Sequence, residues 1–432
     1  MRRKIYSRLL EWKNSKDRRP LMLLGARQVG KTWIMRHFGE QEYSKVVYVN
    51  CDDEPRMKQI FDLDYDIERI LTTLQAITGQ KATPGDTLIV LDEIQEVPRG
   101  LHSLKYFCEK APEYHVMVAG SLLGVTLGSG ESFPVGKVDM LYMYPMDYEE
   151  FLEATGHGEW IGLLHSHDWP LVDALLPKLV ELLRQYYYVG GMPGVVGRYV
   201  ENRDLKQVRT LQHEILDAYG RDISKHTSAA ESVRIRQVLA SLPMQLAKES
   251  KKFVYGAVRK GSRAKDFELA IQWLQDAGII YKVNRIREPR VAIKFYEDFD
   301  AFKLFLLDCG LLACMADAPA DQMLIGDNVF VEFKGAFTEQ YVLQQLLAVG
   351  LTPYYWSNAK TPAKIDFIVQ QGSRLVPIEV KAEENVRARS LLQFIKDNPG
   401  LKGLRLSMKG YANQEWMENI PLVAIDAFFD RK

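Results

Sequence analysis

The stretch that decides the fold is "PLMLLGARQVGKTW", residues 20–33. Its apolar run, residues 20–25, is typical of a strand buried on both faces of a parallel sheet. Residues 25–32 follow the phosphate-binding loop pattern G-x-x-x-x-G-K-[ST]. Residues 31–39 then carry apolar side chains at helical spacing and stop at Gly39, a typical C-cap. This order of strand, loop and helix favours a phosphate-binding loop; the alternative is a glycine-rich turn followed by a stray lysine.

Each part of the loop has an expected role. Gly25 and Gly30 allow a tight backbone path, and the loop amides point at phosphate oxygens near a helix N-terminus. Lys31 would reach the β and γ phosphates of ATP, and Thr32 would place its hydroxyl on Mg²⁺. The expected cofactor-binding residues of this segment are Gly25, Ala26, Arg27, Gln28, Val29, Gly30, Lys31, Thr32 and Trp33.

A second apolar run ends in two acids. In "TLIVLDEIQEVP", residues 87–98, Asp92 and Glu93 stand at the C-terminal end of an expected buried strand, where ligands bind in open α/β sheets. Asp92 would hold Mg²⁺ through its waters, and Glu93 would orient and polarise the attacking water. The alternative is a helix N-cap pair. The phosphate loop earlier in the chain makes the catalytic interpretation more specific.

A third buried run, "YHVMVAGSLLG" over residues 114–124, ends in Ser121. A polar side chain at this edge of the sheet would contact the γ phosphate of ATP, or it would cap the next turn.

Length and composition limit the class of protein. A chain of 432 residues predicts two to four domains, and 47% hydrophobic with 11% aromatic residues is typical of a soluble globular protein. Because 56 basic residues balance 56 acidic ones, any nucleic-acid surface has to be a local patch. The four cysteines show neither disulfide nor zinc spacing. Without a signal peptide or a membrane-spanning run, we expect the protein in the cytoplasm and off the membrane.

Five segments together resemble a family of bacterial and archaeal AAA+ ATPases: "RPLMLLGARQVGKTW", "LIVLDEIQEVP", "VMVAGSLLG", "YMYPMDYEEF" and "YVGGMPGVV". Members carry a C-terminal domain of unknown function that looks like a winged helix joined to a nuclease-like fold. The resemblance implies ATP and Mg²⁺ as cofactors, Lys31 and Glu93 as catalytic residues, and further ATP-site roles for Thr32, Asp92 and Ser121. Lys137 follows Gly136 where such proteins often have an arginine, and Arg221 is a second candidate for an arginine finger. The alternative for both residues is an ordinary surface charge in contact with solvent.

The middle of the chain shows helical patterns. Residues 145–220 predict a helical lid, interrupted at "QYYYVGGMPGVV", residues 185–196, by a hinge or turn. Its tyrosines would either stack on a base or pack under the loop. Residues 232–248 and 264–277 are amphipathic at helical period, and two β-like runs follow. Two helices and a two-stranded wing are the order of a winged helix.

A basic stretch lies between these two helices. It holds Lys251, Lys252, Arg259, Lys260, Arg263 and Lys265, with no acid among them. Such a local excess suits a DNA phosphate backbone. The alternative is a winged helix that docks a protein or closes over a nucleotide, with solvated charges.

The last segment carries a second set of charged residues. Glu339 lies on an expected helix, Asp366 on a strand, and Glu379 and Lys381 share one face of the next strand because side chains alternate. This is the order of the PD-(D/E)xK nucleases, in which three carboxylates hold Mg²⁺ and the lysine positions the attacking water. The expected metal ligands are therefore Glu339, Asp366 and Glu379, beside Lys381. The alternative keeps the fold as architecture only, and Lys364, where relatives often have an acid, favours it.

We therefore predict an α/β protein: a P-loop AAA+ parallel sheet with a helical lid, followed by a winged helix and an α/β restriction-endonuclease-like domain. The expected boundaries are 1–150, 151–225, 226–300 and 301–432. ATP hydrolysis would be coupled to a C-terminal half that binds DNA. Alternatively, an ATP-gated switch or scaffold would bind a protein partner through an inactive nuclease-like domain. An oligomer is compatible with either function.

Overall fold

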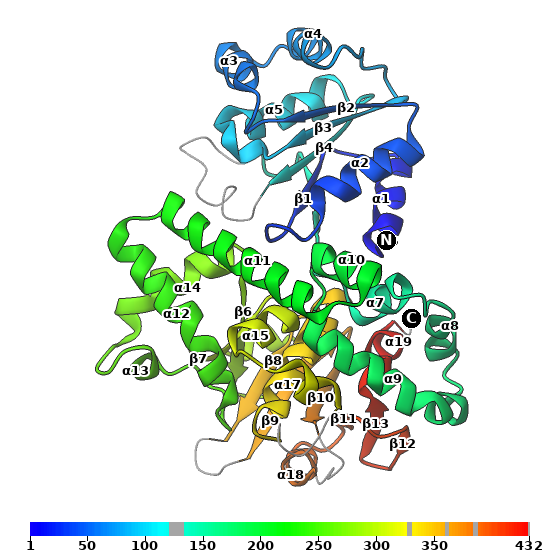
Figure 1. Cartoon of the computed structure of the whole chain (residues 1–432), viewed down its shortest axis with the longest axis vertical. Helices are drawn as coiled ribbons and strands as arrows, with labels where there is room; N and C mark the ends of the chain where they lie inside the picture. The colour runs from blue at the N-terminus through cyan, green and yellow to red at the C-terminus, as the bar shows by residue number, and fades with distance from the viewer. Residues whose placement is uncertain (121–133, 326–330, 359–362, 383–387, 431–432) are drawn as a thin grey trace. The chain divides into compact units, whose positions relative to one another are not determined.

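The structure is a computed structural model of the chain, and it describes residues 1–120, 134–325, 331–358, 363–382 and 388–430. Two compact units make up the fold: Arg2–Tyr144, and Pro145–Gln275 with Ile279–Lys432. Each is built around a sheet of its own (Figure 1). The predicted α/β class is confirmed, with a parallel sheet in the N-terminal unit and a second α/β sheet in the C-terminal unit. In the described ranges no helix is long and apolar enough to cross a bilayer.

The N-terminal unit is a five-stranded parallel sheet in the order β2-β3-β4-β1-β5. Its strands are β1 (Leu21–Leu24), β2 (Lys45–Asn50), β3 (Thr87–Asp92), β4 (His115–Gly120) and β5 (Asp139–Tyr142). Around it lie α1 (Ile5–Asn14), α2 (Lys31–Glu42), α3 (Pro55–Leu63), α4 (Ile67–Thr78), η1 (Ile94–Glu96) and α5 (Pro98–Lys110). The apolar runs of β1, β3 and β4 are buried along their whole length, as predicted. Since these strands are parallel, their carboxyl ends meet at one edge.

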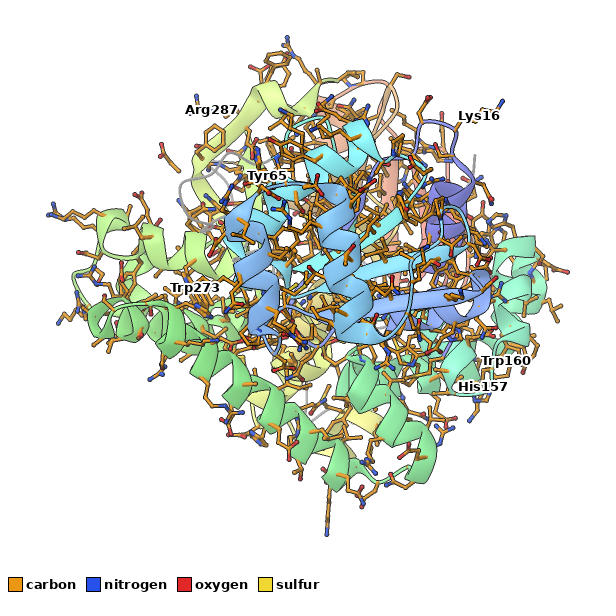
Figure 2. All side chains as sticks on the ribbon, turned by 90° about the horizontal axis from the view of Figure 1, so that it is seen from above. Lys16, Tyr65, His157, Trp160, Trp273 and Arg287 are labelled. Carbon is orange, nitrogen blue, oxygen red and sulfur yellow. The ribbon has the colours of Figure 1, made fainter. Side chains whose placement is uncertain are left out.

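The C-terminal unit begins with helices where the sequence predicts them. They are α7 (Tyr148–Ala154), α8 (Glu159–Ser166), α9 (Trp169–Val189), α10 (Pro193–Asn202) and α11 (Leu205–His226). At the start of α8 the rings of His157 and Trp160 stack with centroids 5.0 Å apart (Figure 2).

The expected turn after α9 is held by close packing. A Cβ on Gly190 would lie 2.2 Å from Asp308 Oδ1, and one on Gly191 would lie 2.1 Å from the Met146 carbonyl oxygen. Gly191 N also donates to Asp308 Oδ2 at 2.6 Å. The three tyrosines before this turn, Tyr186, Tyr187 and Tyr188, are buried, which agrees with the packing alternative rather than base stacking. The glycines are needed here because the backbone approaches its neighbours so closely.

Three helices and an antiparallel hairpin follow: α12 (Ala229–Ala247), α13 (Tyr255–Val258), α14 (Ala264–Asp276), then β6 (Ile280–Ile286), η2 (Ile293–Tyr296) and β7 (Glu297–Leu306). The rest of the unit holds α15 (Cys309–Met315), α16 (Ala320–Ile325), α17 (Val331–Ala348), β8 (Tyr354–Ser357), β9 (Lys364–Gln371), β10 (Arg374–Lys381), α18 (Arg389–Asp397), β11 (Gly403–Ser407), β12 (Ala412–Asn413), β13 (Met417–Pro421), η4 (Leu422–Ala424) and α19 (Ile425–Phe429).

One eight-stranded sheet joins the last two expected segments. Its order is β12-β13-β11-β10-β9-β8-β6-β7, so the β6–β7 hairpin continues the sheet formed by β8 to β13. The link is a parallel bridge between Arg285 on β6 and Tyr355 on β8. The expected boundary between residues 300 and 301 falls inside β7. The hairpin is thus part of the C-terminal sheet and not of a separate layer.

Candidate nucleotide-binding site

The loop after β1 takes a path that two glycines make possible. Gly25 has φ +155°, and a Cβ there would lie 2.3 Å from the Met143 carbonyl oxygen. Gly30, with φ +95° and ψ 23°, precedes α2 and offers no side-chain cap. The first amides of an α-helix have no partner within the helix, so the start of α2 can receive an anion.

Lys31 is folded into the loop. Its Nζ donates to the carbonyl oxygens of Gly25 at 2.9 Å and Ala26 at 2.8 Å, and the residue is 7% exposed. Burial lowers the pKa of Lys31 to about 8, although the charges of Glu93 and Asp92 act in the opposite direction. The ammonium group is therefore held where the loop closes on itself.

Thr32 and Asp92, which the sequence predicts as Mg²⁺ ligands, are in direct contact. Thr32 Oγ1 donates to Asp92 Oδ2 at 2.5 Å, and the second oxygen, Oδ1, accepts from Glu93 N at 3.1 Å. Tyr48 of β2 also donates its hydroxyl to Asp92 Oδ2, at 3.0 Å. A helix hydroxyl beside a carboxylate at the end of a strand provides oxygen ligands of the kind that Mg²⁺ takes.

Glu93 occupies an uncommon backbone conformation. Its φ of 52° and ψ of 41° lie in the left-handed region, which few residues other than glycine adopt. Its Oε2 accepts a hydrogen bond from Gln95 Nε2. Such conformations cost of order 1–3 kcal/mol and cluster at functional sites. The turn that follows β3 is thus built around this acid.

The remaining loop residues differ in exposure. Val29 is buried, and its carbonyl oxygen accepts from Arg3 Nη1 at 3.0 Å. Trp33 is 45% exposed and stacks on His37 with ring centroids 4.7 Å apart. Arg27 is partly buried and Gln28 is exposed with φ 66°. The predicted residue Ser121 lies outside the described residues.

The charged residues predicted in the C-terminal unit lie together. The antiparallel register of β9 and β10 ends with Ile378 opposite Phe367, and its continuation sets Glu379 opposite Asp366 on one face. Asp366 Oδ2 accepts from Val380 N at 2.9 Å, and Lys381 Nζ lies 2.7 Å from Glu379 Oε1. Burial raises the pKa of Glu379 to about 7, and the Asp366 charge adds to this, while Lys381 opposes it.

Glu339 of α17 pairs with two buried lysines that the sequence pattern does not connect with it. Lys251 Nζ lies 2.5 Å from Glu339 Oε1, and Lys303 Nζ lies 3.1 Å from Oε2. Lys303 also donates to the Asp366 carbonyl oxygen at 3.3 Å. Burial alone would raise the pKa of Glu339, but the charges of Lys251 and Lys303 outweigh it and lower that pKa to about 2. We call Lys251, Lys303 and Glu339 the ion triad.

The described residues contain no group of three or more His, Cys, Asp and Glu side chains placed to hold a metal ion. Glu339 faces the two lysines of the ion triad, and Lys364 Nζ lies 3.8 Å from Asp366 Oδ1. A metal role for Glu339, Asp366 and Glu379 stays a prediction. In this arrangement the ammonium groups of Lys251, Lys303 and Lys364 lie beside the carboxylates of Glu339 and Asp366, where a metal ion would otherwise supply positive charge.

The basic stretch needs one correction. Lys251 is 7% exposed and belongs to the ion triad, so it is not available to a DNA phosphate. The exposed members are Lys252, Arg259, Lys260, Arg263 and Lys265. The prediction failed at Lys251 because charge and spacing alone do not show which lysine is buried.

Residues 17–152 match the family described as an AAA domain. This match covers most of the N-terminal unit, which is called the AAA domain below. Two further matches are to domains of unknown function, DUF8612 over residues 180–322 and DUF4143 over residues 334–428. No curated protein matches the chain.

Several solved structures are similar to the chain. The Walker-type ATPase of Pyrococcus abyssi is 16% identical, with a TM-score of 0.47, and the match covers 73% of this chain and 95% of that one. The ORC1 protein of Aeropyrum pernix in complex with DNA is 14% identical, with a TM-score of 0.29 and coverage of 74% and 93%. AMPPCP-bound DnaA of Aquifex aeolicus is 13% identical, with a TM-score of 0.27 and coverage of 63% and 86%. At these low scores, only the match to the AAA domain family identifies the N-terminal unit.

The two arginine-finger candidates have surface environments. Lys137 in the AAA domain pairs with Glu109, with Nζ 2.9 Å from Oε1 and both side chains partly exposed. Arg221 on α11 is exposed. Neither environment distinguishes these residues from ordinary solvated charges.

Sequence reasoning missed two residues that support the AAA site. Tyr48 holds Asp92, and Arg3 joins two backbone segments by donating to the carbonyl oxygens of Val29 and, at 2.7 Å, Tyr144. The alternation of β2 places Tyr48 on one face, but only the strand order sets β2 beside β3. No local pattern marks Arg3, because its partners lie far along the chain.

Proposed function

We propose that the AAA domain binds and hydrolyses ATP with Mg²⁺ and that its nucleotide state controls the C-terminal unit. The observation that carries the proposal is the hydrogen bond between Thr32, in the first turn of α2, and Asp92, at the carboxyl end of β3, beside the buried Lys31. These are the groups that a phosphate-binding loop needs: two oxygen ligands for the metal and an ammonium group for the phosphates.

The residues divide the chemistry among them. Lys31 would exchange its bonds to the loop carbonyl oxygens for the β and γ phosphate oxygens of ATP. Thr32 and Asp92 would hold Mg²⁺, which supplies charge neutralisation to the phosphates when bound. Glu93 would take the proton of the attacking water while the bond between the γ phosphorus and the bridging oxygen breaks, and ADP leaves with that oxygen.

We expect the Lys31→Ala variant to bind Mg-ATP at least tenfold more weakly than the wild type, because the charge that faces the phosphates is lost. In the wild type, affinity should also fall as the pH rises above about 8, since burial lowers the pKa of Lys31 to about 8 and its neutral form cannot pair with phosphate. Isothermal titration between pH 7 and 9.5 measures both effects. Equal affinity in the variant and the wild type would contradict the assignment of the site.

DNA is the first candidate ligand of the C-terminal unit. Helices α12, α13 and α14 with the β6–β7 hairpin follow the order of a winged helix, and five basic residues from Lys252 to Lys265 are exposed beside them. Arg287, on the turn after β6, adds a side chain that is 70% exposed, although it lies 3.8 Å from Asp298 (Figure 2). This exposed charge in a chain of zero net charge supports contact with a phosphate backbone.

Replacing Lys252, Arg259 and Lys260 by alanine should weaken binding to all DNA sequences alike. The slope of log affinity against log salt should fall by about one for each DNA phosphate that the variant no longer neutralises. Fluorescence anisotropy at several salt concentrations measures both. A matched control replaces Lys178, Arg198 and Lys206, exposed basic residues on α9, α10 and α11. If the two triple variants behave alike, the basic stretch is ordinary solvated surface.

A second candidate function is a switch or scaffold that binds a protein partner and does not cut nucleic acid. One observation favours it for the nuclease-like half: Lys251 and Lys303 neutralise Glu339, and Lys364 lies near Asp366. Lysines then occupy the positions where a nuclease would need metal charge. Titration with Mn²⁺ tests this: binding that Asp366→Ala abolishes, together with strand cutting, would favour the nuclease instead.

A further inference from the structure

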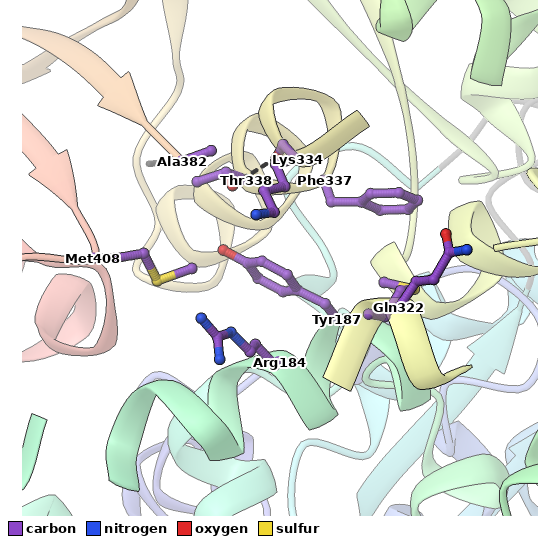
Figure 3. Close-up of a pocket in the computed structure, with 9 residues that line it drawn as sticks. Arg184, Tyr187, Gln322, Lys334, Phe337, Thr338, Ala382 and Met408 are labelled. Carbon is purple, nitrogen blue, oxygen red and sulfur yellow. Dashed lines mark hydrogen bonds between the residues drawn. The ribbon is translucent and has the colours of Figure 1, made fainter. Parts of the chain in front are cut away.

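One pocket of the C-terminal unit lies among α9, α16, α17 and the segments that follow β10 and β11 (Figure 3). Its volume of about 60 Å³ is room for a few water molecules. Lys334 and Phe337, which line it, already interact with other groups. Water accounts for this pocket, whereas the burial of Arg3 in the AAA domain needs a further explanation.

Arg3 is a buried arginine that joins two parts of the backbone. It stands one residue before Lys4, the N-cap of α1, and is 6% exposed. Its Nη1 donates to the Val29 carbonyl oxygen at 3.0 Å, and its Nη2 donates to the Tyr144 carbonyl oxygen at 2.7 Å. Arginine side chains are almost never fully buried without partners of this kind. Because the guanidinium is planar and its donors are fixed, it holds the two carbonyl oxygens at a set separation.

The Val29 carbonyl group belongs to the peptide unit that leads into Gly30. In a trans peptide the C=O and the N–H of one unit point in opposite directions, and the described ranges hold no cis peptide bond. A bond from Arg3 to the Val29 oxygen therefore turns the Gly30 N–H away from Arg3. This N–H donates to no other backbone group in the described part of the chain. Since Gly30 directly precedes α2, its amide lies beside the first amides of that helix, which can receive an anion.

The other end of the bridge is fixed to the start of the same loop. Tyr144 comes two residues after β5, which pairs with β1. Met143 N donates to the Leu24 carbonyl oxygen at 2.7 Å, and Gly25 packs directly against the Met143 carbonyl oxygen. The start of the loop and the segment after β5 are thus one frame. Arg3 connects the last part of the loop to this frame.

We propose that Arg3 is a positioning residue of the ATP site: it holds the Val29–Gly30 peptide to the Tyr144 carbonyl group so that the Gly30 N–H faces a phosphate oxygen. This inference rests on the ATP binding proposed above. The charge of the guanidinium also polarises the peptide, which makes its N–H a stronger donor. A loop held in place before the ligand arrives loses less conformational freedom on binding. Since Arg3 acts on the loop and not on the attacking water, its loss should raise KM and leave kcat nearly unchanged.

The experiment measures steady-state hydrolysis of Mg-ATP by the full chain. Arg3→Met is expected to raise KM about tenfold, because an amide donor to phosphate is no longer held in place. Its kcat should stay within about threefold of the wild type. A loss of folded protein would do the opposite, because it lowers the concentration of active enzyme and so the apparent kcat, and leaves KM unchanged.

Two further variants separate the bridge from the charge. Arg3→Lys keeps the charge without the planar fork, so its KM should rise about threefold, less than in Arg3→Met. Arg2→Met removes an exposed charge from the neighbouring residue and should keep the wild-type KM. If Arg3→Met does not fold, Arg3→Lys decides the question.

A wild-type KM in folded Arg3→Met would overturn the inference, and so would a wild-type KM in Arg3→Lys, which would show that charge alone is sufficient. An equal rise of KM in Arg2→Met and Arg3→Met would indicate a long-range effect of charge and would overturn it as well. All three outcomes leave ATP hydrolysis by the wild type intact. Failure of the wild type to bind and hydrolyse ATP would instead refute the proposed function, and this inference with it.

Discussion

The Glu93→Gln variant is expected to bind Mg-ATP with wild-type affinity and to hydrolyse it about 10² to 10⁴ times more slowly. The amide keeps the size of the side chain but cannot take a proton from water. Glu93 follows directly after Asp92 at the end of β3, and its left-handed backbone fixes the direction in which the side chain leaves the strand. Titration with ATP and a phosphate-release assay measure the two quantities separately.

A neighbouring acid gives the matched control. Glu96 ends the short helix η1, three residues after Glu93, and belongs to the same turn. Glu96→Gln removes one negative charge from this turn without touching the proposed base, so its turnover should stay within about twofold of the wild type. Wild-type turnover in Glu93→Gln would show that this residue is not the base. An equal loss in both variants would point to an effect of charge on the turn.

The residues that lie together at the proposed AAA site could be selected from the sequence because they stand in short continuous segments. The loop from Gly25 to Thr32 is one continuous segment, and Asp92 ends a run of apolar residues that can only be a buried strand or helix. Parallel strands place their carboxyl ends at one edge, so the meeting of Thr32 with Asp92 follows from the fold class. Tyr48 escaped prediction because its contact depends on β2 lying next to β3.

The C-terminal unit was harder to predict for a physical reason. Lys251 and Lys303 contact Glu339 across 88 and 36 residues, and fully buried lysines are rare. Periodicity identifies the strand or helix that holds a residue but not its distant ionic partner. The shared eight-stranded sheet was missed for the same reason, since the bridge between Arg285 and Tyr355 joins residues seventy positions apart. Asp366 and Glu379, by contrast, lie on one hairpin, and its register places them opposite each other.

The largest loss of stability is expected in Glu339→Gln. The change leaves the ammonium groups of Lys251 and Lys303 buried without a carboxylate, and breaking a buried ion pair by removing one partner costs about 3–5 kcal/mol. Because Lys303 is on β7 and Glu339 on α17, the loss should loosen both elements. Hydrogen exchange of amides in these two elements, followed by mass spectrometry, measures the local free energy of opening. The Lys251→Met variant should lose less, since Glu339 keeps Lys303.

The pH dependence of the free energy of unfolding distinguishes the loss of the Glu339 ion pairs from a simple packing defect. The folded-state pKa of Glu339, about 2, lies below its ordinary value of 4.5, so the stability that it contributes is complete above pH 4.5 and is lost as the pH falls towards 2. Glu379 contributes in the opposite direction. Because its folded-state pKa is raised to about 7, its contribution to the free energy of unfolding falls as the pH rises from 4.5 to 7. The stability of Glu339→Gln should therefore fall less steeply below pH 4.5 and follow the wild-type trend above it.

Glu181→Gln, which breaks the exposed pair with Lys178, is the control and should cost less than about 1 kcal/mol of stability. If Glu339→Gln costs no more than Glu181→Gln, the ion triad is not needed to hold β7 and α17 together, and their other contacts, such as the hydrogen bonds of Gln340 with Leu306, are sufficient.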